Sequence, residues 1–339
     1  MKHNHFISLV ALMLLLALSQ GMSAGAPIVP TQRGSQLSAP LAPSNNAPHA
    51  APASGVSFAP HVDYSVGNQP YSVAVGDLNH DGKPDLVTAN FADSTASVRL
   101  GNGIGGFGPE GHYTVGSGPE SVALGGFDGT GNADLVTANY GDNSASVRLG
   151  DGAGGFGAES HYAVGGHPEA VVVGSFNGDD DLATANYDDN SVSVRLGDGG
   201  GSFGAESHYA VGNRPISVAA GDFNGDGKLD LLSANYGGGS VSLLLGNGAG
   251  SFGASASYVV GTHPYSVAVG DFNGDGKLDL VTANQPDATV TVLLGNGAGG
   301  FGVAIPYTVG AAPYSVAVGD FNGDGYPDLA VANYDGTVS

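Results

Sequence analysis

The sequence predicts an all-β protein, a β-propeller built from four-stranded blades, on three observations. Each repeat unit contains four short apolar or alternating runs and no helical period. Many of the 59 glycines follow Asn or Asp in pairs that favour tight hairpins, because both residues tolerate positive φ. The motif "YSVAVGD" returns with variations every 47 or 49 residues, starting at Tyr71, Glu120, Glu169, Ile216, Tyr265 and Tyr314.

Each unit is expected to form its four strands in the same order. In the fifth unit the first strand is "SVAVGD", an acidic loop follows, and "LDLVTAN" forms the second strand. A polar loop precedes the third strand, "VTVLLG", and a "GNGAGGFG" turn leads to a fourth that ends "YTVG". Helix-free units of this length are typical of propeller blades, which leave only short sheet edges exposed. Serial β-solenoid coils are the alternative, but their repeats are usually much shorter.

The array spans residues 56–339, and it neither begins nor ends at the boundary of a complete four-stranded unit. Residues 57–67, "SFAPHVDYSVG", resemble the fourth strand of a blade whose other strands are missing. The last unit stops at "GTVS", where its third strand begins. About six units are therefore visible, the last blade is expected to be incomplete, and the array is expected to be cut short or to continue beyond Ser339. The true number of blades stays open.

The N-terminus is expected to direct export. Lys2 precedes an apolar run from Phe6 to Leu18, and small residues follow, so residues 1–26 are predicted to be a signal peptide. A membrane anchor is the alternative, but a spanning helix needs about 20 apolar residues. Residues 27–55, rich in Pro, Ala and Ser, are expected to form a disordered linker. The mature protein is then secreted or displayed at the cell surface, with no membrane insertion after the signal is removed.

Charge restricts the partners of this chain. The net charge is −22 with nine Lys and Arg residues, so a phosphate backbone or an anionic membrane surface would be repelled. Nucleic acid is therefore excluded, and cations, glycans or proteins remain. The chain has no cysteine, so disulfides cannot stabilise it outside the cell.

The acidic loops have the spacing of a divalent-metal cage. In "GDFNGDGKLDLL", side-chain oxygens recur at positions 1, 3, 5 and 9, a glycine allows the bend at position 6, and position 7 offers its carbonyl. The start resembles an EF-hand, but position 12 is Ser233 rather than Glu. The predicted ligands are Asp77, Asn79, Asp81, Lys83 and Asp85; Asp222, Asn224, Asp226, Lys228 and Asp230; Asp271, Asn273, Asp275, Lys277 and Asp279; and Asp320, Asn322, Asp324, Tyr326 and Asp328.

Two units have lost this pattern. The second has Gly126 and Thr130 at positions 1 and 5, and the third has Ser175 and a two-residue deletion before Asp181. A plain Asp/Asn/Gly turn would explain one loop, but three carboxylates crowded together four times over would repel one another without a cation. An all-oxygen set outside the cell favours calcium, so about four structural Ca²⁺ sites are expected.

The motif "GDFNGDGKLDL" followed by "GGFG" resembles the FG-GAP, or VCBS-type, repeats related to the propeller of integrin α-subunits. The resemblance covers residues 56–339. It implies that each loop joins the first two strands of a blade and that its calcium stiffens the face opposite the ligand surface. The shorter unit and unfinished last blade depart from the integrin pattern, so the resemblance does not carry over the seven-fold count or the ligand.

Three further features admit more than one interpretation. An aromatic residue follows most of the recurrent asparagines Asn90, Asn139, Asn186, Asn235, Asn284 and Asn333. Such pairs suit sugar binding, but packing between blades is the favoured interpretation. The residues before the blade-joining prolines vary, as either a binding face or an unconstrained loop would. Arg99, Arg148 and Arg195 align with Leu244 and Leu293, so their alkyl stems are expected to pack while their heads reach water.

These features predict a calcium-stabilised binding module for a glycan or protein ligand at or outside the cell envelope. No nucleophile motif or phosphate loop appears, and no irregular acidic cluster is recognised outside the repeating ligand set. An enzyme is therefore not expected. The alternatives are a polysaccharide-active hydrolase or lyase that uses carboxylates near the axis, and a passive adhesion or spacer array within a longer surface protein.

Overall fold

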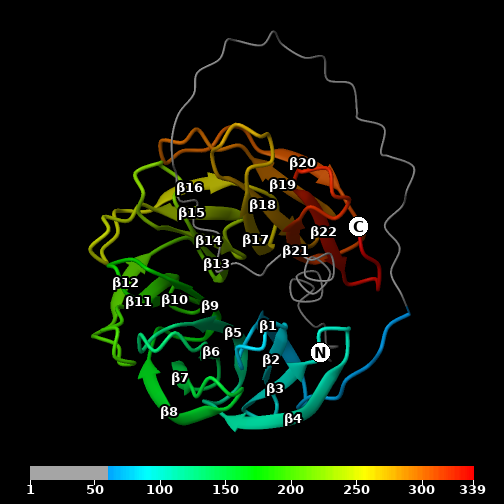
Figure 1. The fold of residues 1–339 in the computed structure, drawn as a ribbon. Helices are drawn as coiled ribbons and strands as arrows, with labels where there is room; N and C mark the ends of the chain where they lie inside the picture. Colours follow the sequence, from blue (N-terminus) through cyan, green and yellow to red (C-terminus); the bar gives the residue numbers. More distant parts are fainter. Residues whose placement is uncertain (1–59) are drawn as a thin grey trace, which may run out of the picture.

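The protein is a ring of small β-sheets, seen in a computed structural model that describes residues 60–339 (Figure 1). These residues form five four-stranded sheets and one two-stranded sheet, which follow one another around the ring as blades 1 to 6. The predicted β-propeller is confirmed, and the solenoid alternative is wrong. The predicted signal peptide, residues 1–26, and the predicted linker, residues 27–55, lie outside the described residues.

Each blade uses consecutive strands. Blade 1 contains β1 (Pro70–Gly76), β2 (Asp85–Asn90), β3 (Thr95–Gly101) and β4 (Phe107–Thr114). Blade 2 contains β5 (Pro119–Gly125), β6 (Asp134–Asn139), β7 (Ser144–Gly150) and β8 (Phe156–Ala163). Blade 3 contains β9 (Pro168–Gly174), β10 (Asp181–Asn186), β11 (Ser191–Arg195) and β12 (Ser207–Ala210). Blade 4 contains β13 (Pro215–Gly221), β14 (Asp230–Asn235), β15 (Ser240–Leu244) and β16 (Ala256–Val259). Blade 5 contains β17 (Pro264–Gly270), β18 (Asp279–Asn284), β19 (Thr289–Leu293) and β20 (Ile305–Thr308), and blade 6 contains β21 (Pro313–Gly319) and β22 (Asp328–Asn333).

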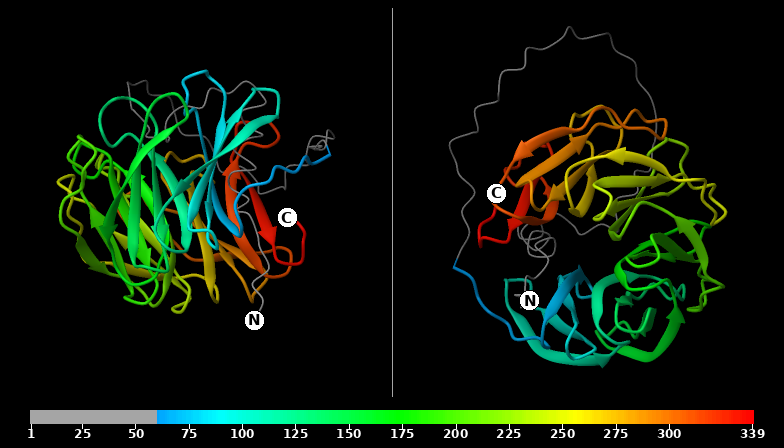
Figure 2. Two further views of the ribbon diagram at one scale, coloured as in Figure 1. Left: turned by 90° about the horizontal axis from the view of Figure 1, so that it is seen from below. Right: turned by 180° about the vertical axis from the view of Figure 1, so that it is seen from behind.

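Within each blade, consecutive strands pair antiparallel, and the first strand lies innermost. The first strands of consecutive blades pack together from β1 to β5, β9, β13, β17 and β21. Across the described residues no comparable packing joins β21 to β1. Figures 1 and 2 show the ring open between the last blade and the first.

The core lies between blades rather than within one layer. The second residue of the loop between the first two strands is buried in blades 1 to 4, and in blades 2, 3 and 4 it is a phenylalanine that meets the "FG" phenylalanine of the next blade. Phe176 and Phe252 make such a pair, with ring centroids 5.3 Å apart. Tyr209 of the outer strand β12 contacts Phe252 as well, also at 5.3 Å. Edge-to-face aromatic contacts of this kind add to the burial of apolar area.

The unfinished last blade is confirmed. Blade 6 has two strands, and a bridge between Ala332 and Val338 marks the start of a third. At the other end of the array, Tyr64 contacts Phe107 of blade 1 at 5.2 Å, as Tyr113 contacts Phe156 of blade 2 at 5.4 Å. Residues near Tyr64 therefore pack on blade 1 as an outer strand packs on the following blade.

The expectation for the three arginines was wrong. Arg148 Nε donates to the Thr114 carbonyl of the preceding blade at 2.8 Å, and its Nη1 donates to the Gly157 carbonyl of its own blade. Arg195 does the same, and Arg99 donates to the Gly108 carbonyl of its own blade and to the Ser65 carbonyl, which precedes blade 1. The guanidinium donates to outer strands of two blades because its fork can reach both, which leucine at the same position cannot do. Residues 60–339 contain no helix long and apolar enough to cross a membrane.

Candidate functional site

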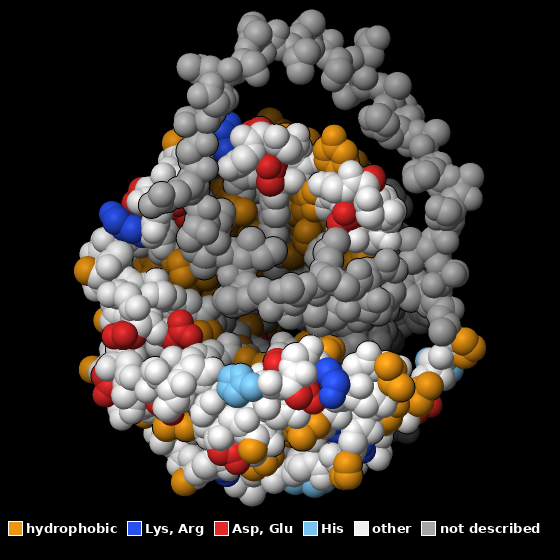
Figure 3. Space-filling view, viewed as in Figure 1, with side chains coloured by type: hydrophobic (Ala, Val, Ile, Leu, Met, Phe, Trp, Pro, Cys, Tyr) orange, Lys and Arg blue, Asp and Glu red, His pale blue; other side chains and the backbone are white. Residues whose placement is uncertain are grey.

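The acidic loops lie where the sequence predicted, between the first and second strands of blades 1, 4, 5 and 6. All four therefore open on one face of the ring, at the end of each first strand. The four predicted ligand sets stay apart, one in each blade. Figure 3 shows acidic side chains spread around the ring rather than gathered in one patch.

Within a loop, the ligand oxygens fix a tight turn. In blade 4, Asp222 Oδ2 accepts a hydrogen bond from the Gly227 amide at 2.8 Å, and its Oδ1 accepts from the Gly225 amide at 2.7 Å. Asn224 Oδ1 accepts from the Asp226 amide at 2.9 Å, and Asp226 Oδ1 accepts from the Lys228 amide at 3.0 Å. Gly227 has a φ of 79°, which glycine adopts without strain. The predicted role of this glycine is confirmed.

The same turn recurs in blades 1, 5 and 6. Asp77, Asp271 and Asp320 each accept the amide of the glycine at position 6, at 2.8, 2.7 and 2.9 Å. The hydrogen bond from the Gly325 amide lowers the pKa of the Asp320 carboxyl. Lys83 Nζ lies 3.0 Å from Asp81 Oδ2, and this side-chain hydrogen bond lowers the pKa of Asp81. These carboxyls are therefore held in the ionised form that a cation requires.

The aspartate at position 9 has a second role that sequence reasoning missed. Asp230 is fully buried; its Oδ2 accepts from the Phe223 amide at 2.9 Å and its Oδ1 from the Gly246 amide at 2.7 Å. Burial raises the pKa of Asp230 to about 6. Asp134 makes the same two bonds in blade 2, whose loop has lost its ligand set. This aspartate therefore links the loop to the end of the third strand by two hydrogen bonds, whether or not the loop holds a metal. We call this pair of hydrogen bonds the aspartate clip.

In blades 1 to 4, the loop between the first and second strands also touches the next blade. The carbonyl at position 2 accepts a hydrogen bond from a glycine in the turn between strands three and four of that blade. Gly154 donates to Leu78 at 3.1 Å, Gly201 to Phe127 at 2.9 Å, Gly250 to Phe176 at 2.8 Å and Gly299 to Phe223 at 3.1 Å. A change in loop rigidity is thus transmitted directly to the interface between blades.

The donor set of these loops fits calcium. It contains only carboxylate, amide and carbonyl oxygens, which are the ligands that Ca²⁺ takes. Within residues 60–339, however, no three acidic or histidine side chains already stand close enough to hold one ion. Binding therefore requires the loop carboxylates to turn toward one another, and the lysine at position 7 to release its partner at position 5.

The opposite face carries the recurrent asparagines, and these are structural. Asn235 is fully buried; its Nδ2 donates to Ser240 Oγ at 3.2 Å and to Ser242 Oγ at 3.0 Å. The aromatic that follows packs on the residue before the next blade's proline, as Tyr140 stacks on His167 at 4.1 Å and Tyr236 on His263 at 4.2 Å. The interpretation as packing between blades is confirmed.

The residues before the blade-joining prolines share an unusual backbone. Each has a positive φ, between 48° and 57° in the five that are not glycine: Gln69, His167, Arg214, His263 and Ala312. Gly118 occupies the sixth position. Non-glycine residues in this region carry strain that surrounding contacts must offset. The strain is therefore present at five of the six joints, where the chain turns toward the axis.

A β-bulge follows each of these prolines. The register shifts between the proline and the second residue after it, so the residue between them has no partner on the second strand. A bulge re-aims a side chain and occurs often beside functional sites. The six bulged residues sit on the innermost strands and differ from blade to blade: Tyr71, Glu120, Glu169, Ile216, Tyr265 and Tyr314.

Two of these bulged residues correct the expectation that no irregular acidic cluster stands outside the repeating ligand set. Glu120 and Glu169 lie on adjacent innermost strands, β5 and β9, which pack together. Burial, with the neighbouring Glu169 charge, raises the pKa of Glu120 to about 9. Burial, with Asp188, raises the pKa of Glu169 to about 7. The signal was available in the sequence, because the position after each proline varies between Tyr, Glu and Ile.

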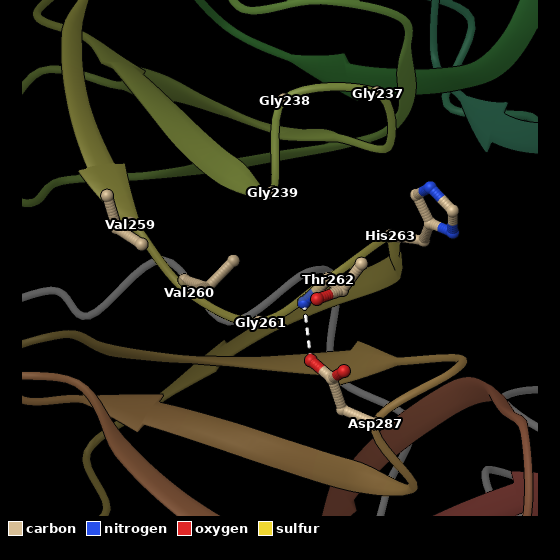
Figure 4. Close-up of a pocket in the computed structure, with 9 residues that line it drawn as sticks. All are labelled: Gly237, Gly238, Gly239, Val259, Val260, Gly261, Thr262, His263 and Asp287. Atoms are coloured by element: carbon tan, nitrogen blue, oxygen red, sulfur yellow. Dashed lines mark hydrogen bonds between the residues drawn. The ribbon is translucent and has the colours of Figure 1, made fainter.

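A groove of about 470 Å³ opens on the same face between blades 4 and 5 (Figure 4). It is lined by Gly237–Gly239, the segment from Val259 to His263, and Asp287, which accepts a hydrogen bond from the Thr262 amide at 2.6 Å. In other blades an aspartate of this turn caps the neighbouring joint, as Asp142 caps Ser117 at 2.8 Å. On the other side of the groove, blade 4 presents Gly237–Gly239, which have no side chains to fill it.

Comparison with solved structures supports the fold. A functionally unknown protein from Desulfotomaculum acetoxidans is 14% identical with a TM-score of 0.61, over 81% of this chain and 86% of that one. A catalytically inactive virginiamycin B lyase from Staphylococcus aureus with quinupristin is 13% identical, with a TM-score of 0.57, over 81% and 80%. The periplasmic gluconolactonase of Pseudomonas aeruginosa is 16% identical, with a TM-score of 0.55, over 79% and 74%. At these identities the similarity shows the fold alone.

Sequence comparison gives the family. No curated protein matches the chain. The family model described as "FG-GAP-like repeat" matches residues 77–137, 176–233, 222–282 and 271–331, more than half of the chain and including all four predicted ligand sets. The chain therefore belongs to the FG-GAP-like repeat family.

Proposed function

We propose that this protein is an exported, calcium-stabilised binding module that takes a glycan or protein ligand at or outside the cell envelope. The observation that carries the proposal is the separation of two kinds of loop. The repeating acidic loops follow the end of each first strand, whereas the residues that differ between blades precede or begin that strand. The loops on one face therefore follow a repeating pattern, which suits a stabilising role. The residues on the other face differ from blade to blade, which suits recognition of a ligand.

Calcium supplies rigidity in this scheme. The residues that would hold an ion in blade 4 are Asp222, Asn224, Asp226 and Asp230, with the Lys228 carbonyl. Ligands in one loop would be drawn together, and the loop's position-2 carbonyl would hold the next blade more firmly. In a chain without disulfides, this cross-bracing takes the place of covalent links.

The test is a binding screen with and without chelator. The full chain is applied to a glycan array and to a panel of extracellular proteins, in millimolar calcium and in EDTA. Hits that disappear in EDTA, and that weaken in a His263→Ala variant but persist in the outer-strand variant His112→Ala, support the proposal. A complete absence of hits in calcium would favour a spacer array instead.

A polysaccharide-active hydrolase or lyase is the second candidate, and the glutamate pair favours it. A carboxyl with a raised pKa can act as a general acid near neutral pH, and Glu120 and Glu169 are two such groups on neighbouring strands. Activity on a polysaccharide panel that is lost in both Glu120→Gln and Glu169→Gln would establish this candidate in place of a pure binding module.

A further inference from the structure

The ring of bulged residues is divided into two unlike halves. Glu120 and Glu169 occupy consecutive blades, and Tyr265, Tyr314 and Tyr71 belong to blades 5, 6 and 1. Tyr265 and Tyr314 are in contact, with ring centroids 4.4 Å apart. Tyr71 stacks on Phe91 at 5.0 Å, and Tyr265 meets Tyr236 at 5.2 Å. An acidic side and an aromatic side therefore border the axis at one level.

The two glutamates are without partners. Among residues 60–339 neither accepts a hydrogen bond and neither forms an ion pair, although both are half-buried. The described Lys and Arg residues lie elsewhere: three lysines in acidic loops, three arginines on the third strands of blades 1, 2 and 3, and Arg214 over the Tyr187 ring at 5.2 Å. Half-buried carboxylates that lack an internal cation carry a cost that an external cation would remove.

We propose that this axial ring binds an alkylammonium group, namely a lysine side chain presented by a protein partner. The inference rests on the proposed binding function and narrows its ligand. Carboxylates attract the ammonium, and tyrosine faces attract it by a cation–π interaction. The tyrosines also offer apolar surface to the methylene stem.

The ligand binds the ionised form of the glutamates, so its affinity rises with pH. The titratable groups that face the pair are Tyr71, Tyr140, Tyr265, and Asp188 with its partner His167, 2.6 Å away. With pKa values of about 7 for Glu169 and about 9 for Glu120, affinity increases between pH 6 and pH 9 and binding releases protons. A purely hydrophobic site shows neither effect.

The experiment is a calorimetric titration of the calcium-loaded full chain with Nα-acetyl-lysine amide at pH 6, 7.5 and 9. Nα-acetyl-norleucine amide, which has the same chain length but no charge, is the matched control ligand. Glu120→Gln with Glu169→Gln is expected to weaken lysine amide binding by about tenfold or more, since a tenfold change is about 1.4 kcal/mol. Glu206→Gln, immediately before the outer strand β12, is the matched control variant and leaves binding unchanged.

The outcomes separate this inference from the function on which it rests. Equal binding of the lysine and norleucine amides, tighter binding of glucosamine, or no effect of the double variant overturns the lysine assignment. The binding-module proposal still stands in those cases if the array screen gives calcium-dependent hits. A melting curve of the double variant checks its fold, and Tyr265→Leu gives a second loss of affinity that does not depend on charge.

Discussion

Replacing the buried aspartate at position 9 by alanine separates its role as a clip from its role as a metal ligand. Asp134 in blade 2 and Asp230 in blade 4 are both fully buried, and each accepts two backbone amides. The blade 4 loop retains the metal-ligand set, whereas the blade 2 loop has lost it. The pair Asp134→Ala and Asp230→Ala therefore differs chiefly in the predicted calcium.

The magnitude follows from the two bonds. Each variant leaves two amides without a partner in a buried setting, at about 1–3 kcal/mol each, so both are expected to lose about 2–6 kcal/mol of unfolding free energy in chelator. With calcium at about 100 times its dissociation constant, a site adds about 2.7 kcal/mol of stability. In calcium, Asp230→Ala should therefore lose that further amount, and Asp134→Ala should not.

The assay is urea unfolding in EDTA and in calcium, with amide hydrogen exchange as the local measurement. Exchange at Phe127 and Gly150 reports on the Asp134 clip, and exchange at Phe223 and Gly246 reports on the Asp230 clip. A loss below about 1 kcal/mol in chelator contradicts the clip. An Asp230→Ala loss that is the same in EDTA and in calcium contradicts the metal role of position 9.

Three further predictions follow from the same structure. Gly246→Ala should destabilise the protein strongly, because a β-carbon there would lie 2.1 Å from the Leu229 carbonyl oxygen; thermal melting against the exposed variant Ser251→Ala checks this, and an unchanged melting temperature contradicts it. Glu120→Gln should stabilise the fold. The pKa of the Glu120 carboxyl rises from 4.5 to about 9 on folding, so the wild type becomes less stable as the pH rises from about 4.5 to about 9. Unfolding at pH 5 and pH 9 should show a gain for the variant that grows with pH, and a gain independent of pH would refute the assignment. Gly126→Asp combined with Thr130→Asp should restore a ligand set in blade 2 and raise calcium stoichiometry by one in equilibrium dialysis, whereas Gly126→Asn with Thr130→Val should not.

The repeating features were predictable from the sequence because the same pattern recurs from unit to unit along the chain. Four-stranded blades, the unfinished last blade and the bend at Gly227 all follow from spacing and turn chemistry, and the structure confirms them. The two hydrogen bonds that Asp134 accepts could not be predicted from the sequence, because the second donor, the Gly150 amide, belongs to another strand. Only the three-dimensional register brings that amide to the carboxylate.

The features that differ between blades were harder to interpret. Arg148 donates to two blades, and no single repeat contains both of its acceptors. The Glu120 and Glu169 pair lies 49 residues apart in the chain, and its meaning depends on the bulge that aims both side chains away from the regular strand pairing. Variation after each proline was visible in the sequence, but its location on the innermost strand was not.

Calcium uptake measured together with thermal stability tests the central claim most directly. A titration of the full chain should saturate at about four ions, and saturation should raise the melting temperature relative to the chelated protein. No uptake at millimolar calcium, with identical melting in calcium and in EDTA, would show that the acidic loops brace the ring by their hydrogen bonds alone.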